Sequence, residues 1–85
     1  MALDPIVFQN VSPGQWERIR AGLAADGILV NSAQGEMERD GVRIRWSYDV
    51  LRQTLTVQCL KKPWIYPASA VQARLQETFQ RLARS

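Results

Sequence analysis

The feature that most constrains the fold is an unbroken alternation of apolar and polar residues from Val42 to Tyr48. Four apolar side chains, at Val42, Ile44, Trp46 and Tyr48, alternate with Arg43, Arg45 and Ser47. This period of two is typical of a β-strand with one buried face and one open face. The sequence therefore predicts a strand here, and the rest of the chain must pair with it or cover its apolar side.

The dipeptide Asp40-Gly41, directly before this strand, is typical of a two-residue hairpin turn in which both residues take positive φ. The turn predicts a register for the preceding segment: Arg39 opposite Val42, Glu38 opposite Arg43, Met37 opposite Ile44, and Glu36 opposite Arg45. Opposite charges would then face one another across the strands, and such pairs favour one register.

Further strands are predicted on both sides of the hairpin. Thr54 to Cys59 alternates again, with Leu55, Val57 and Cys59 on the inner face, and residues 49–53 form the connection. Ile28 to Val30 is predicted to start the first strand, with residues 31–35 as a polar turn or bulge. The apolar run Ile6 to Phe8 either adds an edge strand or packs under the first helix.

Two amphipathic helices are predicted. Ser12, Pro13 and Gln15 have the spacing of a capped helix start with a capping box, Val11 and Trp16 are placed for a hydrophobic staple, and Gly27 ends the helix. The second helix is predicted to begin at a Ser69 cap, with Gln72 at capping-box spacing. Its apolar stripe consists of Val71, Leu75, Phe79 and Leu82.

These elements predict one α+β domain over residues 1–85. Their order is α-β-β-β-α, with an antiparallel meander of three to four strands and both helices packed on one sheet face. This order resembles the double-stranded RNA-binding domain, in which two helices lie on one side of a three-stranded sheet. That family has a lysine-rich motif at the start of its second helix. Here Lys61-Lys62 is separated from the helix by residues 63–68, and Val71-Gln72-Ala73 contains no lysine.

The composition argues against an enzyme and against a bound metal or cofactor. The chain has no His, and its single Cys59 can form neither an internal disulfide nor a zinc cluster. Cys59 is predicted to be a buried small hydrophobe and Asp49 a turn cap; an enzyme using Tyr48, Asp49 or Cys59 is the least favoured class. Met1 to Pro5 lacks the features of a signal peptide, and no apolar run is long enough to span a bilayer. We therefore expect a cytoplasmic protein without a membrane partner.

Charge is distributed unevenly along the chain. Residues 1–42 contain three arginines and six acidic residues, whereas residues 43–85 contain six arginines and two lysines with only Asp49 and Glu77 as acids. A basic C-terminal half attracts anionic partners, although the same charge also serves solubility.

The segment from Lys61 to Pro67 is the best candidate for a functional surface. Pro63 and Pro67 favour an extended crossover over a regular strand. Ile65 is predicted to point inward and anchor this crossover, which would leave Trp64 and Tyr66 exposed beside the two lysines.

Two functions follow as hypotheses from these surfaces. The first is a non-catalytic interaction module that binds a protein or itself. It would use the crossover and the open sheet face through Lys61, Lys62, Trp64, Tyr66, Arg43 and Arg45. The alternative is nucleic-acid binding, in which Arg74, Arg81 and Arg84 join these cations and Trp64 or Tyr66 stacks on bases.

Overall fold

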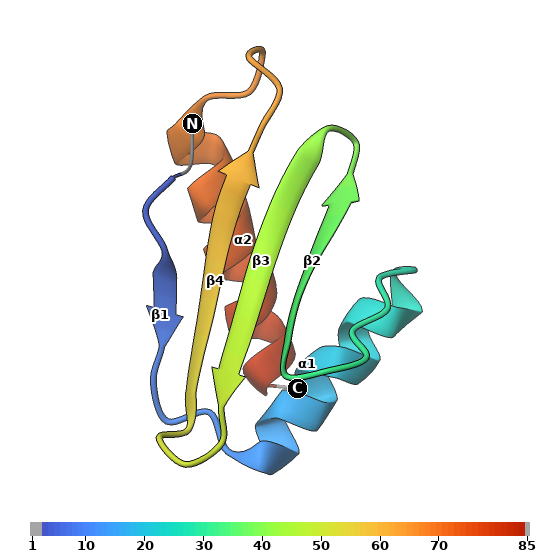
Figure 1. Ribbon diagram of the computed structural model, residues 1–85, viewed down its shortest axis with the longest axis vertical. Coiled ribbons are helices and arrows are strands. Elements are labelled where there is room, and N and C mark those ends of the chain that lie inside the picture. The colour runs from blue at the N-terminus through green and yellow to red at the C-terminus, as the bar shows by residue number, and fades with distance from the viewer. Residues whose placement is uncertain (1–2, 85) are drawn as a thin grey trace.

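The computed structural model describes residues 3–84, so Met1 and Ala2 of the segment examined for a signal peptide lie outside it. It contains a four-stranded sheet and two helices (Figure 1). In chain order the elements are β1 (Ile6–Phe8), α1 (Pro13–Ala25), β2 (Gln34–Arg39), β3 (Val42–Asp49), β4 (Thr54–Lys61) and α2 (Ala68–Arg84). The strand order is β1-β4-β3-β2, and each neighbouring pair is antiparallel.

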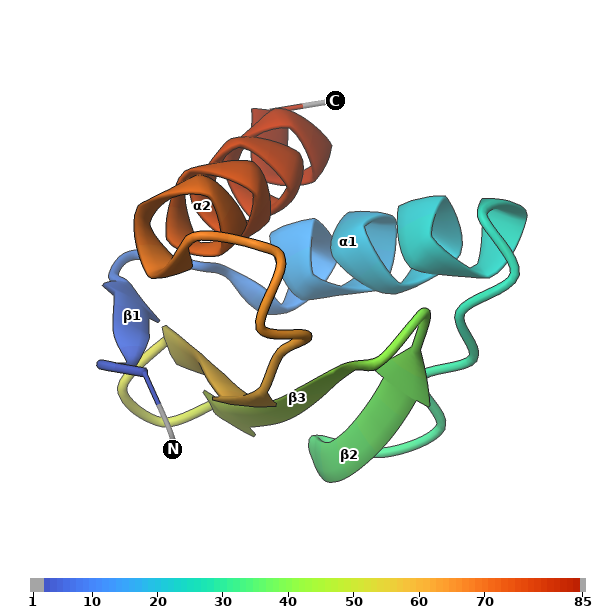
Figure 2. The same cartoon turned by 90° about the horizontal axis from the view of Figure 1, so that it is seen from above.

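Both helices lie on the same face of the sheet and leave the other face open (Figure 2). The α+β class, the antiparallel meander and the placement of the helices are confirmed. Of the two possibilities for the run Ile6 to Phe8, the structure shows the edge strand. This strand pairs with β4 and places Ile6 opposite Val57. This edge strand precedes α1, so the chain has one more strand than the plain α-β-β-β-α order.

The β2–β3 hairpin has the predicted register, from Arg39 opposite Val42 to Glu36 opposite Arg45. Asp40 and Gly41 have φ angles of 54° and 81°, as the two-residue turn requires. The charges pair differently from a simple one-to-one ladder. Glu36 contacts both Arg43, at 3.1 Å, and Arg45, at 3.7 Å.

Replacing Gly41 by Val is expected to lower the free energy of unfolding by more than about 1 kcal/mol, because a β-branched residue resists positive φ. A Cβ at this position would also lie only 2.9 Å from Cγ of Pro63. Urea unfolding measures the loss. Gly41→Asn is the matched control, since Asn tolerates positive φ and should lose less. If Gly41→Val unfolded like the wild type, the positive φ at the turn would be wrong.

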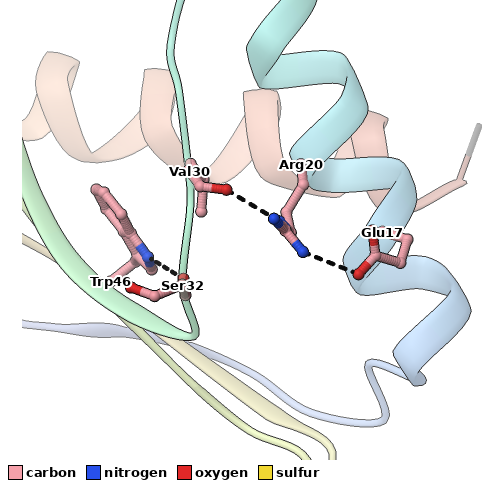
Figure 3. Close-up of polar contacts among 5 residues, drawn as sticks. All are labelled: Glu17, Arg20, Val30, Ser32 and Trp46. Carbon is pink, nitrogen blue, oxygen red and sulfur yellow. Dashed lines mark hydrogen bonds and ion pairs between the residues drawn. The ribbon is translucent and has the colours of Figure 1, made fainter.

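The segment predicted as the first strand is not a strand. Residues 28–30 belong to the connection 26–33 between α1 and β2, which begins only at Gln34. Val30 is nevertheless buried in the core, and its carbonyl accepts a hydrogen bond from Nε of Arg20 at 3.0 Å (Figure 3). Ile28 and Val30 pack into the core as alternate residues of a strand would, and Leu29 between them is exposed, but the backbone here crosses from the helix to the sheet edge without a strand partner.

Helix α1 begins and ends as predicted. The amide of Gln15 donates to Oγ of Ser12 at 3.2 Å, and the Ser12 amide donates to Oε1 of Gln15 at 2.9 Å, which completes the capping box. At the other end Gly27 has a φ of 84°, and the Ile28 amide donates to the Leu23 carbonyl. The buried face of the helix consists of Trp16, Ile19 and Leu23.

Helix α2 does not begin at a Ser69 cap. It starts at Ala68, and the Val71 amide donates to the Pro67 carbonyl at 3.2 Å, so Ser69 is already the second helical residue. A proline at a helix start loses no intrahelical bond, and Pro67 therefore takes the boundary position in place of Ser69. The amide Nε2 of Gln72 donates to the Asp4 carbonyl at 2.8 Å, so this side chain ties the helix to the N-terminal segment.

The core lies between the sheet and the helices. Leu55, Val57 and Cys59 of β4 are fully buried, which confirms their predicted inner position. Trp46 is 6% exposed and belongs to the same buried cluster as Trp16 of α1 and Phe79 of α2. Its indole Nε1 donates to the Ser32 carbonyl at 3.1 Å (Figure 3). Trp46 therefore lies under the helices, as the alternation of β3 predicted.

Candidate interaction surface

Three consecutive apolar side chains are exposed in the connection between β4 and α2. Trp64 is 91% exposed, Ile65 59% and Tyr66 43%. The amide of Tyr66 donates to the Pro63 carbonyl at 3.1 Å, which closes a turn over residues 63–66. We call these four residues the aromatic turn. The connection that contains it projects beyond the end of the sheet, at the top of Figure 1.

The predicted exposure of Trp64 and Tyr66 is confirmed, but the predicted conformation is wrong. An extended crossover would have placed Ile65 opposite its neighbours and directed it inward. The chain instead reverses within the turn, so alternation does not apply and Ile65 is exposed as well. The core is closed by side chains of the helices and the sheet, and Ile65 is not among its residues.

The base of the aromatic turn is packed against the hairpin. The position of a Cβ built on Gly41 lies 2.9 Å from Cγ of Pro63, so the hairpin tip and the turn are in direct contact. Proline also fixes its own φ at positions 63 and 67. The turn is therefore held at its base while its side chains remain open to solvent.

The predicted basic residues divide into two groups. Lys61 lies opposite Arg43 at the hairpin end of the sheet, where the β3–β4 register shifts between Arg43 and Ile44. Neither Lys61 nor Lys62 has an ion-pair partner within residues 3–84. Arg43 and Arg45, by contrast, share Glu36. The two lysines therefore carry positive charge next to the aromatic turn that no ion pair offsets within residues 3–84, while Arg43 and Arg45 together keep one net positive charge.

The open sheet face is mainly polar, as the alternation predicted. Ser47, Thr54 and Thr56 are half-buried there, and Nε2 of Gln58 donates to the Leu3 carbonyl at 2.9 Å. Val7 of β1 adds an exposed apolar side chain that sequence reasoning missed. In the sequence, the apolar run Ile6 to Phe8 was compatible with an edge strand, but it did not indicate which side chain would be exposed. Among the strand residues that the structure describes, Val7 is the one exposed large apolar side chain.

The residues considered for catalysis have structural contacts. Cys59 is fully buried, and Oδ1 of Asp49 accepts hydrogen bonds from the amides of Leu51 and Arg52 at 3.1 and 3.2 Å. The Tyr48 hydroxyl donates to the Val11 carbonyl at 2.6 Å, and its ring stacks on Trp16 with centroids 5.0 Å apart. Within residues 3–84 no group of three or more His, Cys, Asp or Glu side chains is arranged to hold a metal ion.

Burial, and secondarily the charge of Asp49, raises the pKa of Tyr48 above its ordinary value of 10.0. The unfolded chain therefore ionises this hydroxyl first, and the stability that the protonated group contributes is lost as the pH rises above about 10.

We expect Tyr48→Phe to lose less stability than the wild type between pH 9 and pH 11, roughly the range of tyrosine ionisation. At neutral pH it should be destabilised by about 1–2 kcal/mol, because the buried Val11 carbonyl loses its donor. Urea unfolding across this range tests both points, and parallel curves for the two proteins would contradict the first.

A second exposed apolar pair lies in the β3–β4 loop, at the other end of the sheet. Val50 and Leu51 project from this loop, and Leu51 is 93% exposed. The sequence had marked this segment only as a connection. The loop offers no aromatic side chain and no lysine.

Comparison with known protein families, curated proteins and solved structures finds no match to this chain. No helix in the described part of the chain is long and apolar enough to cross a membrane.

Proposed function

We propose that this chain is a small protein-binding module that contacts its partner through the aromatic turn. The observation that supports this most directly is the 91% exposure of Trp64 beside exposed Ile65 and Tyr66. Trp and Tyr are the residues most enriched where a few side chains dominate an interface. Clustered apolar side chains on a soluble domain commonly mark an interaction site.

The support of the turn adds to this proposal. Pro63 rests against Gly41, and the Tyr66 amide is bonded to the Pro63 carbonyl. A turn held in this way loses less conformational freedom on binding than a free loop would. The unpaired Lys61 and Lys62 beside it favour a partner with acidic groups around an apolar pocket, since complementary charge speeds association and fixes orientation.

Nucleic-acid binding remains the second candidate, supported by two unpaired lysines next to two exposed rings. It is less favoured because the other cations are dispersed or partly offset by an acidic residue. Arg43 and Arg45 share Glu36. Arg81 and Arg84 lie in the last turn of the 17-residue α2, whose axis is about 24 Å long, while the lysines precede its first turn. Phosphate backbones recruit several cations together.

We propose that the module is non-catalytic. The burial of Cys59, the turn contacts of Asp49 and the hydrogen bond of Tyr48 to Val11 support this part of the proposal. It also places the protein in the cytoplasm, where a single unpaired Cys is stable against oxidation.

Light scattering on the purified protein separates the candidates. We expect the 9.7 kDa monomer mass, unchanged by a single-stranded oligonucleotide or an RNA duplex. A dimer mass that Trp64→Ala abolishes would make a second copy the partner. A mass increase with oligonucleotide that Trp64→Ala abolishes would replace the protein-binding proposal by the second candidate.

Affinity capture then tests the protein partner itself. Immobilised wild-type protein is compared with Trp64→Ala and with Leu51→Ala, a control that truncates an equally exposed apolar side chain at the opposite end of the sheet. We expect a captured protein that is lost with Trp64→Ala and kept with Leu51→Ala. Equal capture by all three would contradict the proposal.

A further inference from the structure

A hollow of about 520 Å³ lies between the end of β1, the first half of α1 and the last turns of α2. It is far from the aromatic turn, which precedes the opposite end of α2 (Figure 1). The hollow is largely open to solvent, so a ligand there would be only partly enclosed. No residue of the aromatic turn lines it, and neither does Lys61 or Lys62.

One part of the hollow is apolar. Phe8, Val11 and Ala83 contribute to its lining; Val11 is buried and the other two are half-buried. The Phe8 ring stacks on Phe79 of α2, with centroids 5.9 Å apart. This contact fixes Phe8, so the apolar part of the hollow is preformed.

The other part is positively charged. Arg18 of α1 and Arg84 of α2 both line the hollow, and neither has an ion pair or hydrogen bond with any residue of the described chain. No acidic side chain is among the lining residues. The first turn of α1 also lacks an acidic residue, so its positive end is not neutralised by its own side chains. Two cations that line one hollow without a counterion favour an anionic group there.

We propose that this hollow binds a small amphipathic anion. The apolar body of the ligand contacts Phe8, Val11 and Ala83, and its carboxylate or phosphate group binds the guanidinium groups of Arg18 and Arg84. The exposed amide of Gln80 is placed at the same hollow to donate a further hydrogen bond. This inference is independent of the protein-binding proposal, because the two sites share no residue.

An NMR titration of the backbone amides tests the site with four probes: octanoate, octyl phosphate, octanamide and inorganic phosphate. We expect octanoate or octyl phosphate to shift the amides of Phe8, Val11 and Ala83. The tighter of the two identifies the anionic group. Octanamide has the same apolar body without the charge and should bind at least tenfold more weakly, as should inorganic phosphate, which lacks the apolar body.

The double variant Arg18→Gln/Arg84→Gln should raise the dissociation constant at least tenfold. Arg74→Gln is the matched control, since Arg74 is an exposed arginine of α2 that does not line the hollow. All three arginines are exposed, so the variants should keep the wild-type melting temperature. The proposal is overturned if neither octyl anion binds, if the double variant binds as tightly as the control, or if octanamide matches octanoate.

Discussion

Replacing Trp46 by Ala is expected to lower the free energy of unfolding by about 3–5 kcal/mol. Trp46 is only 6% exposed, it lies in the main buried cluster, and its indole bonds the Ser32 carbonyl at 3.1 Å. Gly35 on β2 leaves room for the indole of Trp46, since a Cβ at position 35 would lie 2.5 Å from Cζ2 of the indole. The truncation leaves a cavity and an unpaired carbonyl together. Because domains of this size are marginally stable, the variant should be largely unfolded at 37 °C.

Trp64→Ala is the control for this experiment, since the same chemical change is made at a side chain that is 91% exposed. Urea unfolding of the two variants should therefore differ by several kcal/mol, with Trp64→Ala close to the wild type. A loss below about 1 kcal/mol for Trp46→Ala would contradict the assignment of the inner sheet face.

The second large effect is expected on binding. Trp64→Ala should weaken the affinity for the protein partner by at least about 30-fold, which corresponds to about 2 kcal/mol, the threshold of a dominant interface residue. The reason is that the indole is the largest exposed apolar group of the chain and its backbone is held by the turn. Isothermal titration with the captured partner measures the change. Leu51→Ala should leave the affinity within about twofold, because most exposed side chains outside an interface are neutral to binding.

The hairpin and the first helix were predictable because their signals are local. Asp40-Gly41 sets a turn that only a few residue types can form, and the alternation of β3 then allows one register that buries Trp46. The capping box at Ser12 likewise depends on residues three positions apart. Such features can be derived from the sequence because no distant segment competes with them.

The wrong predictions concern residues whose conformation depends on segments far away in the sequence. Val30 is buried as a strand residue would be, but the path from α1 to the sheet edge leaves it without a strand partner. Ser69 has capping-box spacing, yet Pro67 already occupies the helix boundary. An extended chain would place Ile65 in the core, but the chain forms a turn over residues 63–66 and Ile65 is exposed.

The candidate sites were predictable to different degrees. The exposure of Trp64 and Tyr66 was predicted on the premise of an extended chain with Ile65 pointing inward; the exposure is confirmed, but the premise is wrong. That Glu36 contacts two arginines at once did not follow, since cross-strand pairing predicts one partner for each charge. The hollow at Arg18 and Arg84 combines three segments far apart in the sequence, so no local pattern indicates it.

The most direct measurement on the aromatic turn is made on the double variant Trp64→Ala/Tyr66→Ala, with the free energy of unfolding and the partner affinity determined on the same sample. If the turn is a binding surface, unfolding changes by less than about 1 kcal/mol, as for exposed positions, while the affinity falls by more than about 30-fold. If the two rings stabilise the fold instead, the variant loses more than about 2 kcal/mol of stability, and its folded fraction binds the partner as tightly as the wild type. That second result would contradict the proposed function.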